Sequence, residues 1–230
     1  MVPSARAASS VTVIVPVLND DAVLDALLSQ LQPWALRCVV VDGTPSAETA
    51  ALVARHGQCY VHGQRGRGAQ IATGCAATDS DWLWVLHADS CVDQPLVAAL
   101  LAVCGGPPAW GRCDVRIPGL AMVAWFMNRR SRWTGICTGD QAMFFHRSLL
   151  DDVGGFPVQP LMEDVELSRR LKRAHGDAFR PLKVAVGTSP RRWRRQGVVR
   201  TVLRMWWYRT RYFCGADPVA LYQAYYGTTR

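Results

Sequence analysis

The chain has 230 residues, and its 26 Lys and Arg against 18 Asp and Glu give a formal net charge of +8. Half of the residues are hydrophobic and 19% are charged, which excludes a disordered polyampholyte and allows a buried core of ordinary size. This length suits one large domain, or one domain with a small appendage.

The first half of the chain alternates β-rich apolar runs with helical patterns, which is typical of a parallel sheet with crossover helices. Strands are predicted at 11–17, 38–41, 58–61 and 82–86. Helices are predicted at 20–31, 47–56 and 95–103, and a further one opens in the loop 63–68 and runs to about 77. The expected fold class is α/β, with a Rossmann-like, mostly parallel central sheet flanked by helices.

The second half of the chain is less regular. Strands are predicted at 112–117, 141–145 and 181–186, an apolar stretch lies at 120–128, and helices are predicted at 161–174 and 192–213. The segment 178–216 holds ten basic residues and no acidic one, so the rest of the chain carries 16 − 18 = −2. An anionic partner would therefore meet this C-terminal stretch, unless it is simply a solvated basic face.

A helical projection of 198–213 separates apolar from basic side chains. Valines 198, 199 and 202 with Trp206 and Phe213 fall on one face, and Arg200, Arg204 and Arg211 on another. This pattern predicts a helix lying on an anionic membrane surface. The alternative is a helix that packs its aromatic stripe against the rest of the protein. The sequence contains none of the usual nucleic-acid-reading motifs, so a nucleic-acid partner is not expected.

The cysteines and the N-terminal residues indicate the cellular compartment in which the protein is expected. Eight cysteines are widely spaced, with no C-x-x-C pair, and are interpreted as reduced thiols. Residues 1–10 lack an apolar segment typical of a cleaved signal, and the longest apolar run is too short to span a bilayer. We therefore expect a flexible tail at 1–10 and a cytoplasmic protein, peripheral at the inner face of the plasma membrane if the basic helix lies there.

Acidic residues follow the predicted strands at three separate places. Asp42 follows the second strand, Asp89 follows the fourth, and Glu163 with Asp164 opens a late helix. Ligands of open α/β sheets bind beyond the carboxyl ends of the strands, so these acids are expected to meet at one rim. Each also has a structural explanation: an Asx-turn at Asp42, a turn or cap at Asp89, and a favoured helix N-terminus at 163–164.

Clustered carboxylates beside phosphates suggest Mg²⁺ or Mn²⁺, which take oxygen ligands, and Asp89 is the best candidate ligand. His87 would point the same way as Asp89 if the backbone is extended, for coordination or equally for stacking or hydrogen bonding. The loop 63–68, with Arg65 and Arg67, could approach an anion. It lacks the third glycine of the dinucleotide fingerprint, and no P-loop string occurs, which disfavours a NAD enzyme and a P-loop NTPase.

Several strings together resemble glycosyltransferase family 2. V-I-V-P-V-L-N-D at 13–20, V-V-D-G at 40–43, G-R-G-A-Q at 66–70 and L-H-A-D-S at 86–90 resemble its nucleotide-binding half. T-G-D-Q at 138–141, L-M-E-D-V-E-L at 161–167 and R-R-W at 191–193 resemble its acceptor-site, catalytic-base and C-terminal motifs. More narrowly, the strings at 86–90 and 161–171 resemble a bacterial arsenosugar-biosynthesis-type subgroup.

This resemblance implies a GT-A fold, a nucleotide-sugar donor, a divalent metal and inversion at the anomeric carbon. It divides the chain into the tail at 1–10, a GT-A domain at 11–190 and a basic, aromatic-rich helical extension at 191–230. The sequence departs from the family pattern at two places. His87-Ala88-Asp89 stands where many members carry D-x-D, which concerns the metal, and Ala72 stands where relatives often show Asn, which concerns the donor pocket.

Carried over by position, the resemblance implies that Asp89 holds the metal, that Asp164 is the general base and that Glu163 supports it. The implied donor-site residues are Pro16, Asp42, Arg67, Gln70, His87, Arg191, Arg192 and Trp193. The implied acceptor side is Gly139, Asp140 and Gln141. The alternative is a non-catalytic protein of the same fold that binds membranes or other anionic partners through its basic helix. The presence of both Asp89 and Asp164 favours the enzyme.

Overall fold

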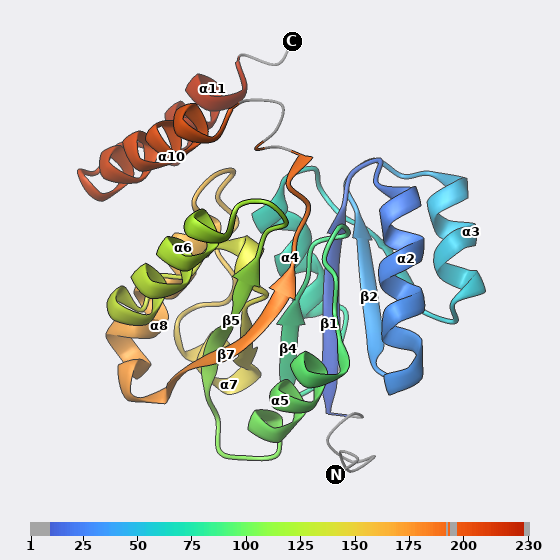
Figure 1. Cartoon of the computed structure of the whole chain (residues 1–230). Coiled ribbons are helices and arrows are strands. Elements are labelled where there is room, and N and C mark those ends of the chain that lie inside the picture. The colour runs from blue at the N-terminus through green and yellow to red at the C-terminus, as the bar shows by residue number, and fades with distance from the viewer. Residues whose placement is uncertain (1–9, 192, 194–196, 228–230) are drawn as a thin grey trace.

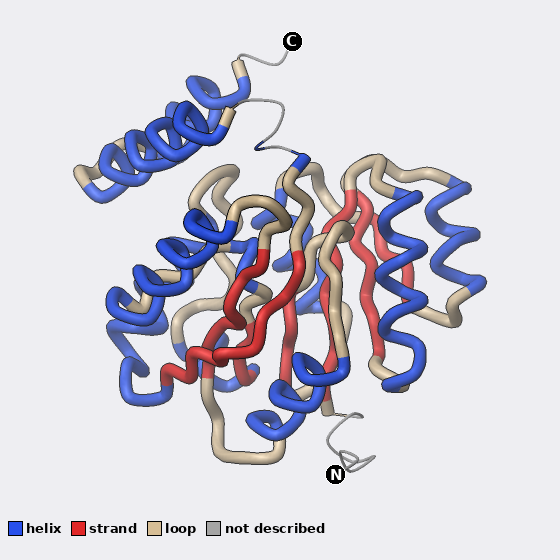
Figure 2. The backbone as a smooth tube through the Cα atoms, viewed as in Figure 1, coloured by secondary structure: helices blue, strands red, loops and turns tan. Residues whose placement is uncertain are grey.

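The computed structural model describes residues 10–191, 193 and 197–227. Within this part, one seven-stranded sheet has the order β3-β2-β1-β4-β6-β5-β7. Its strands are β1 (Val11–Val17), β2 (Arg37–Asp42), β3 (Cys59–His62), β4 (Trp82–Val85), β5 (Trp110–Arg116), β6 (Phe144–His146) and β7 (Phe179–Gly187). Strand β6 runs antiparallel to β4 and β5, and the other pairs are parallel. The predicted α/β class with a mostly parallel sheet is confirmed (Figure 2).

Helices flank the sheet on both sides (Figure 1). They are α2 (Asp21–Leu31), α3 (Ala47–Arg55), α4 (Arg67–Ala76), α5 (Gln94–Cys104), α6 (Ala121–Thr134), α7 (Arg147–Asp152), α8 (Glu163–His175), α10 (Val198–Phe213) and α11 (Pro218–Tyr226). Short 3₁₀ turns are η1 (Gln32–Trp34), η2 (Gly139–Gln141) and η3 (Gly176–Ala178).

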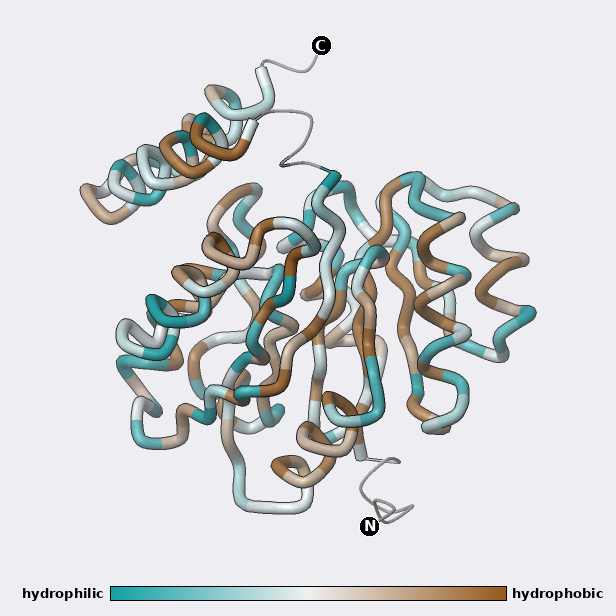
Figure 3. The backbone as a smooth tube through the Cα atoms, in the orientation of Figure 1, coloured by the Kyte–Doolittle hydropathy of each residue, from teal (hydrophilic) through white to brown (hydrophobic). Residues whose placement is uncertain are grey.

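The central strands are buried on both faces, which explains their unbroken apolar sequence. In β1, Val13 and Val15 pack in the cluster formed with α2, α3 and α5, whereas Ile14 packs in the cluster formed with α4, α7 and α8. In β2, Val40 and Val41 divide between the two clusters in the same way. This alternation follows from the two-residue period of a strand. Hydrophobic colour runs along β2 and α5 in Figure 3.

Two local expectations need correction. Residues 139–141 form η2, and strand β6 begins at Phe144 rather than at 141, because Ala142 takes a left-handed φ of 47°. The apolar stretch at 120–128, for which no element was predicted, begins at the N-cap residue Leu120 and continues in α6. The last basic helix begins at Val198, after Gly197 with φ 78°, and of the predicted residues before it, 192 and 194–196 lie outside the described part of the chain.

Helices α10 and α11 form a hairpin beyond the carboxyl ends of the strands (Figure 1). Arg204 of α10 donates to the Tyr225 carbonyl at 2.8 Å and lies over that ring at 3.9 Å, which joins the two helices. Val198 and Val202 pack against the domain, whereas Trp206 and Phe213 are exposed. The apolar face of the projection therefore does not meet a single surface, because part of it packs against the domain and part of it faces solvent. Among the described residues, no helix is long and apolar enough to cross a membrane.

The cysteines are free thiols, as predicted. Five are buried, and burial raises the pKa of Cys38, Cys75, Cys104 and Cys137 to about 12. These buried thiols are packing groups, because the reactive thiolate is suppressed at neutral pH.

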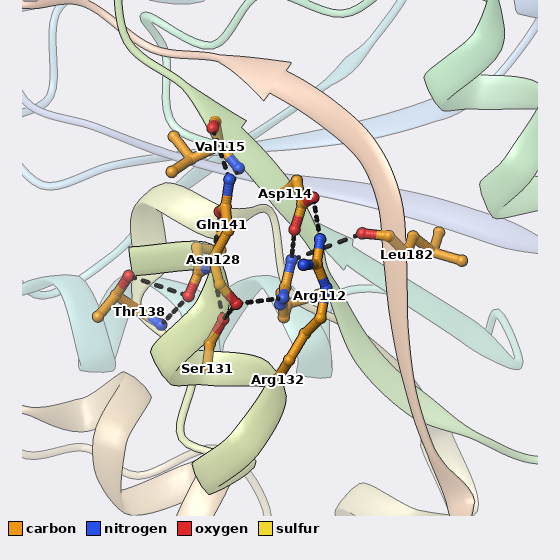
Figure 4. A network of polar contacts seen from close by, with 9 residues as sticks. All are labelled: Arg112, Asp114, Val115, Asn128, Ser131, Arg132, Thr138, Gln141 and Leu182. Carbon is orange, nitrogen blue, oxygen red and sulfur yellow. Dashed lines mark hydrogen bonds and ion pairs between the residues drawn. The ribbon is translucent and has the colours of Figure 1, made fainter. Parts of the chain in front are cut away.

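A buried polar network fixes α6 on strand β5 (Figure 4). Arg112 is 0% exposed and donates to the Asp114 carboxylate, which also accepts from Arg132 of α6. Arg112 donates further to the backbone carbonyl of Asn128 at 2.9 Å. The Asn128 side chain exchanges two hydrogen bonds with the backbone of Val115, at 2.8 and 3.0 Å. Helix α6 is therefore held on β5 by the ion pair of Arg132 with Asp114 and by the hydrogen bonds of the Asn128 side chain to the Val115 backbone.

We expect Asp114→Ala to destabilise the fold by about 3–5 kcal/mol, because it leaves the charge of the fully buried Arg112 uncompensated. Chemical denaturation would measure this loss. The surface variant Asp152→Ala is the control, and the double variant Arg112→Met/Asp114→Leu should recover most of the stability, because it removes both charges. A loss below about 1 kcal/mol for Asp114→Ala would contradict the assignment.

Candidate active site

A cavity of about 790 Å³ opens at the carboxyl ends of the strands. Asp89 and Asp164, far apart in sequence, both line it. The walls come from the end of β1, the loop before α4, the segment after β4, the loop around η2, the start of α8, the segment after β7 and the hairpin α10–α11. The predicted convergence of these two acids at one rim is therefore what the fold produces.

Asp89 lies four residues beyond the end of β4 and is partly exposed. Among the described residues, nothing forms a hydrogen bond or an ion pair with its carboxylate, so its oxygens are available to a ligand in the cavity. The described residues contain no group of three His, Cys, Asp or Glu side chains that could hold a metal ion by themselves. A single free carboxylate still fits Mg²⁺ or Mn²⁺ when the remaining ligands are phosphate oxygens and waters.

His87 lies on the same wall and contacts the η2 loop. Its Nδ1 is 3.4 Å from Oδ1 of Asp140, and its Nε2 is buried without a partner among the described residues. A Cβ at Gly139 would lie 2.9 Å from Nε2, so the close approach of this loop needs glycine at 139. The contact with Asp140 favours a hydrogen-bonding role for His87, one of the alternatives left open by the sequence.

Asp164 is positioned by the first turn of α8. Its Oδ2 accepts a hydrogen bond from the Gly139 amide at 2.7 Å, and its Oδ1 accepts one from the amide of Val165 at 2.7 Å. Met162, in a left-handed conformation with φ 63°, precedes the helix and turns the chain into it. The carboxylate is therefore held at the cavity wall in one orientation, next to the η2 loop.

Glu163 is the buried acid of the site, 4% exposed, with an oxygen 3.8 Å from Nε of Arg67. Burial, reinforced by the charge of Asp164, raises the pKa of Glu163 to about 7. Gly68 brings α4 against the segment before α8, since a Cβ there would lie 2.5 Å from the Pro157 carbonyl oxygen. Arg67 and Glu163 are thereby held together at the cavity wall.

We expect Glu163→Gln to change the pH dependence of stability. Folding raises the pKa of Glu163 from 4.5 to about 7, so the folded protein holds this proton more tightly than the unfolded chain. The resulting contribution to stability is fully present below about pH 4.5 and is lost as the pH rises through about 7. The wild type should therefore lose stability relative to the variant across this window, on the order of 3 kcal/mol. Denaturation at pH 5 and pH 8 measures it, and parallel curves for the two proteins would contradict it.

Of the residues predicted for the donor site, Pro16, Arg67 and Gln70 line the cavity, but the Gln70 amide is engaged elsewhere. Its Nε2 donates to the carbonyls of Val17 and Val41 at 2.7 and 2.8 Å, and so holds the ends of β1 and β2 together. Gln70 therefore shapes this wall chiefly by fixing two strands.

Asp42 is a correction to the predicted site. Asp42 is not among the described residues that line the cavity, and it is 1% exposed. Its Oδ1 accepts from the Thr44 amide at 2.8 Å, and its Oδ2 accepts from the Tyr60 hydroxyl at 2.9 Å. The Asx-turn explanation is the one realised here, because both oxygens are satisfied inside the protein.

The remaining predicted residues divide between cavity and scaffold. Arg191 and Trp193 line the cavity, and Trp193 also packs in the cluster beneath the C-terminal hairpin. Arg192 lies outside the described residues. Gly139 and Asp140, predicted for the acceptor side, line the cavity. The lining formed by the described residues does not include Gln141, which is fully buried.

Gln141 instead joins the η2 loop to α6. Its Nε2 donates to the Ser131 hydroxyl at 2.9 Å, and its Oε1 accepts from the Thr138 amide at 3.3 Å (Figure 4). The network that holds α6 on β5 therefore also holds the loop that carries Gly139 and Asp140.

Sequence reasoning missed the wall contributed by the C-terminal hairpin. It is lined by Met205, Tyr208, Arg209, Tyr222, Tyr225 and Tyr226. The signal was present in the density of tyrosines at 208–226, but only the aromatic side chains of 198–213 were interpreted, either as membrane-facing or as packed against the rest of the protein. A helical projection shows which residues share a face and leaves open what that face covers.

The family model for glycosyl transferase family 2 matches residues 12–156. The chain belongs to glycosyl transferase family 2. It is 34% identical over 97 residues to uncharacterized glycosyltransferases of Mycobacterium tuberculosis and Mycobacterium bovis. That alignment covers 42% of this chain and 44% of each relative, so the match spans less than half the length of these relatives.

Solved structures share the fold of this family 2 chain. Glucosyl-3-phosphoglycerate synthase of Mycobacterium tuberculosis, in complex with Mn²⁺, UDP and glucosyl-3-phosphoglycerate, has a TM-score of 0.60 at 15% identity, covering 78% of this chain and 73% of that one. A mannosyltransferase of Pyrobaculum calidifontis, in complex with GDP-mannose and Mn²⁺, has a TM-score of 0.57 at 21% identity, covering 77% and 56%. These likenesses establish the GT-A fold.

Proposed function

We propose that this protein transfers a sugar from a nucleotide-sugar donor to an acceptor hydroxyl, with inversion at the anomeric carbon and with a divalent metal. The observation that carries the proposal is the free carboxylate of Asp89 in one cavity with the oriented carboxylate of Asp164. The family, and the nucleotide-sugar and Mn²⁺ complexes of the structural neighbours, support it.

Asp164 is the general base. Each of its oxygens accepts one backbone hydrogen bond, which leaves a lone pair for the proton of an acceptor hydroxyl. As that proton moves to Asp164, the hydroxyl oxygen forms a bond to C1 of the sugar from the face opposite the leaving group. The bond from C1 to the diphosphate oxygen breaks, which releases the nucleoside diphosphate and inverts C1.

The diphosphate side needs positive charge. Asp89 would hold the divalent metal, with phosphate oxygens and waters as its other ligands, and a metal bound there neutralises charge on the departing diphosphate. Arg191 lines the same cavity and offers a planar guanidinium to phosphate oxygens. Arg67 is oriented by Glu163 toward the same wall.

A donor screen tests this function. UDP- and GDP-sugars are assayed with and without Mn²⁺ for thermal stabilisation and for slow hydrolysis, since ligand at 100 times its Kd adds about 2.7 kcal/mol. We expect one nucleotide series to stabilise the protein and to be hydrolysed in a metal-dependent way. No stabilisation by any nucleotide-sugar would overturn the proposal. The arsenosugar-type subgroup, suggested by the strings at 86–90 and 161–171, concerns the acceptor and stays a prediction.

We also retain the division into a GT-A domain at 11–190 and an extension at 191–230, with a membrane-facing role for the extension. The observation that favours this role is the exposure of α10: Trp206 and Trp207 are 64% and 60% exposed beside Val199 and Leu203. Aromatic side chains of this kind suit the headgroup level, and the neighbouring arginines suit anionic lipid. A cytoplasmic, peripheral location follows from this proposal.

Flotation with vesicles containing phosphatidylglycerol tests the membrane contact. We expect wild-type protein to float and Arg200→Glu/Arg211→Glu to lose at least ~30-fold in partitioning, because each basic residue contributes about 1 kcal/mol near an anionic surface. Arg204 is left unchanged, since it holds α11. Vesicles of phosphatidylcholine alone are the control. Equal partitioning of both proteins, or no flotation at low salt, would remove the membrane role.

A further inference from the structure

Helix α6 turns its large apolar side chains toward solvent. Trp125, Phe126 and Trp133 are 52%, 59% and 72% exposed, and Met122 is 74% exposed. Counted from Met122, the other three follow after three, four and eleven residues, so all four lie along one side of the helix. This side runs over about three turns.

The opposite side of α6, which packs on the protein, carries smaller groups. Its buried residues are Ala124, Met127 and Ser131. A surface helix of a globular protein normally buries its apolar stripe and exposes its polar residues, so α6 has the reverse arrangement. Large apolar side chains gathered on one exposed surface mark a place that meets a partner.

Arg129 lies among these aromatic side chains. Its guanidinium is 5.3 Å from the centroid of the Trp125 ring and 4.3 Å from that of the Trp133 ring. Helix α10 repeats the combination, with the exposed Arg211 at 5.8 Å from the ring of Trp207. Helix α6 contains three arginines and α10 contains four, and neither contains an acidic residue. The outward side of α6, called the α6 face below, comprises Met122, Trp125, Phe126, Arg129 and Trp133.

Helices α6 and α10 adjoin the same part of the core (Figure 1). Met127 of α6 belongs to the cluster that also holds Val115 and Trp193, and Val198 and Val202 of α10 pack against it. Each helix therefore has one side on this cluster and presents exposed aromatic and basic side chains on another.

An anionic lipid surface is the partner whose chemistry matches the α6 face. Tryptophan rings suit the headgroup level of a bilayer, and arginines beside them suit its phosphates. A second copy of this chain would bring Arg129 against a like charge, which is costly at an interface. A protein partner ordinarily takes a few aromatic anchors into pockets, whereas α6 and α10 spread theirs along two helices.

We propose that the α6 face is a docking surface of the GT-A domain for a bilayer that contains anionic lipid. This goes beyond the membrane role proposed for the extension at 191–230, because it assigns a contact to the catalytic domain itself. Lipid phosphates accept hydrogen bonds from Arg129, and the rings of Trp125 and Trp133 lie at the headgroup level. Contact through α6 as well as α10 fixes the orientation of the domain on the bilayer.

Flotation of the full-length protein with vesicles of phosphatidylglycerol and phosphatidylcholine tests this contact. We expect Trp125→Ser/Trp133→Ser and Arg129→Glu each to lose at least about tenfold in partitioning. Trp125→Phe/Trp133→Phe should retain most of the binding, because it keeps an aromatic ring at both positions. Val158→Ser is the matched control, since Val158 is 63% exposed and lies outside both helices, and it should float like the wild type.

Fluorescence quenching by brominated phosphatidylglycerol separates α6 from α10. In Trp206→Phe/Trp207→Phe, the exposed tryptophans that remain are those of the α6 face, because the others are buried or half-buried. We expect brominated vesicles to quench part of the fluorescence of this variant. Adding Trp125→Phe/Trp133→Phe should abolish the quenching.

These outcomes are independent of the transferase reaction. None of the five residues of the α6 face lines the cavity, so stabilisation by the nucleotide-sugar chosen in the donor screen should be the same in Trp125→Ser/Trp133→Ser and in the wild type. This equality also shows that the variant folds.

Equal flotation of Trp125→Ser/Trp133→Ser and the wild type would overturn the proposal, even if α10 binds the membrane. So would the absence of quenching in Trp206→Phe/Trp207→Phe, or equal flotation on phosphatidylcholine alone. Failure of the wild type to float would overturn it as well. Sedimentation and retention on polyglutamate would then show whether a second copy or an acidic protein covers the α6 face.

Discussion

Asp164→Asn is expected to reduce kcat and kcat/KM together by about 10²–10⁴-fold, because it removes the group that takes the acceptor proton in the transition state. The variant should fold, since the asparagine carbonyl can still accept the Gly139 amide that Asp164 accepts at 2.7 Å. Single-turnover transfer with saturating donor measures the loss, and circular dichroism checks the fold.

Asp93→Asn is the matched control for Asp164. Asp93 caps α5 by accepting from the Leu96 amide, and the lining drawn from the described residues does not include it. If Asp164 served only the N-terminus of its helix, both variants would lose at most about 1 kcal/mol of stability, because asparagine keeps an accepting oxygen and removes only the charge, and both would keep their activity. Activity of Asp164→Asn within tenfold of the wild type would therefore remove its role as base.

Asp89→Ala is expected to lose at least about 10³-fold in transfer, because stabilisation of the leaving diphosphate by a metal is worth several kcal/mol. The loss should appear first as a higher Mn²⁺ requirement, since phosphate oxygens and waters would then be the metal's remaining ligands. Titration of Mn²⁺ against nucleotide-dependent thermal stabilisation measures this requirement without any acceptor.

Asp81→Ala provides the comparison for Asp89. Asp81 is exposed and precedes β4, at the end of the strand opposite the cavity, so the substitution removes a carboxylate near the same strand but away from the cavity. It should leave the Mn²⁺ requirement unchanged. An equal Mn²⁺ requirement for wild type and Asp89→Ala would show that this carboxylate does not hold the metal.

Local sequence determined the first four strands and the acids that follow them. The buried runs of β1, β2 and β4 are apolar on both faces because helices cover both, and this is visible in the residues themselves. Asp89 and Asp164 were predicted at one rim from the rule that ligands bind beyond the carboxyl ends of strands. The structure places both in one cavity.

The burial of Asp42 and Gln141 was decided by the tertiary structure. Both were predicted as site residues, yet each has its polar atoms satisfied by partners inside the protein, Tyr60 for one and Ser131 for the other. The motif strings contain these residues, but a motif does not state which hydrogen-bond partner lies nearest. That partner comes from segments distant in sequence, and it decides whether a polar side chain faces the ligand or the core.

The far wall of the cavity was decided in the same way. Composition identified 191–230 as basic and aromatic, and the projection separated apolar from basic side chains along 198–213. Which face packs depends on the contacts of α10 with the cluster around Val115 and Trp193 and with α11 through Arg204. Local sequence thus set the strands and the two principal acids, because burial and strand period act over a few residues. The pairing of β6 and the closing of the cavity by α10 and α11 depend on contacts between distant segments, which only the folded chain brings together.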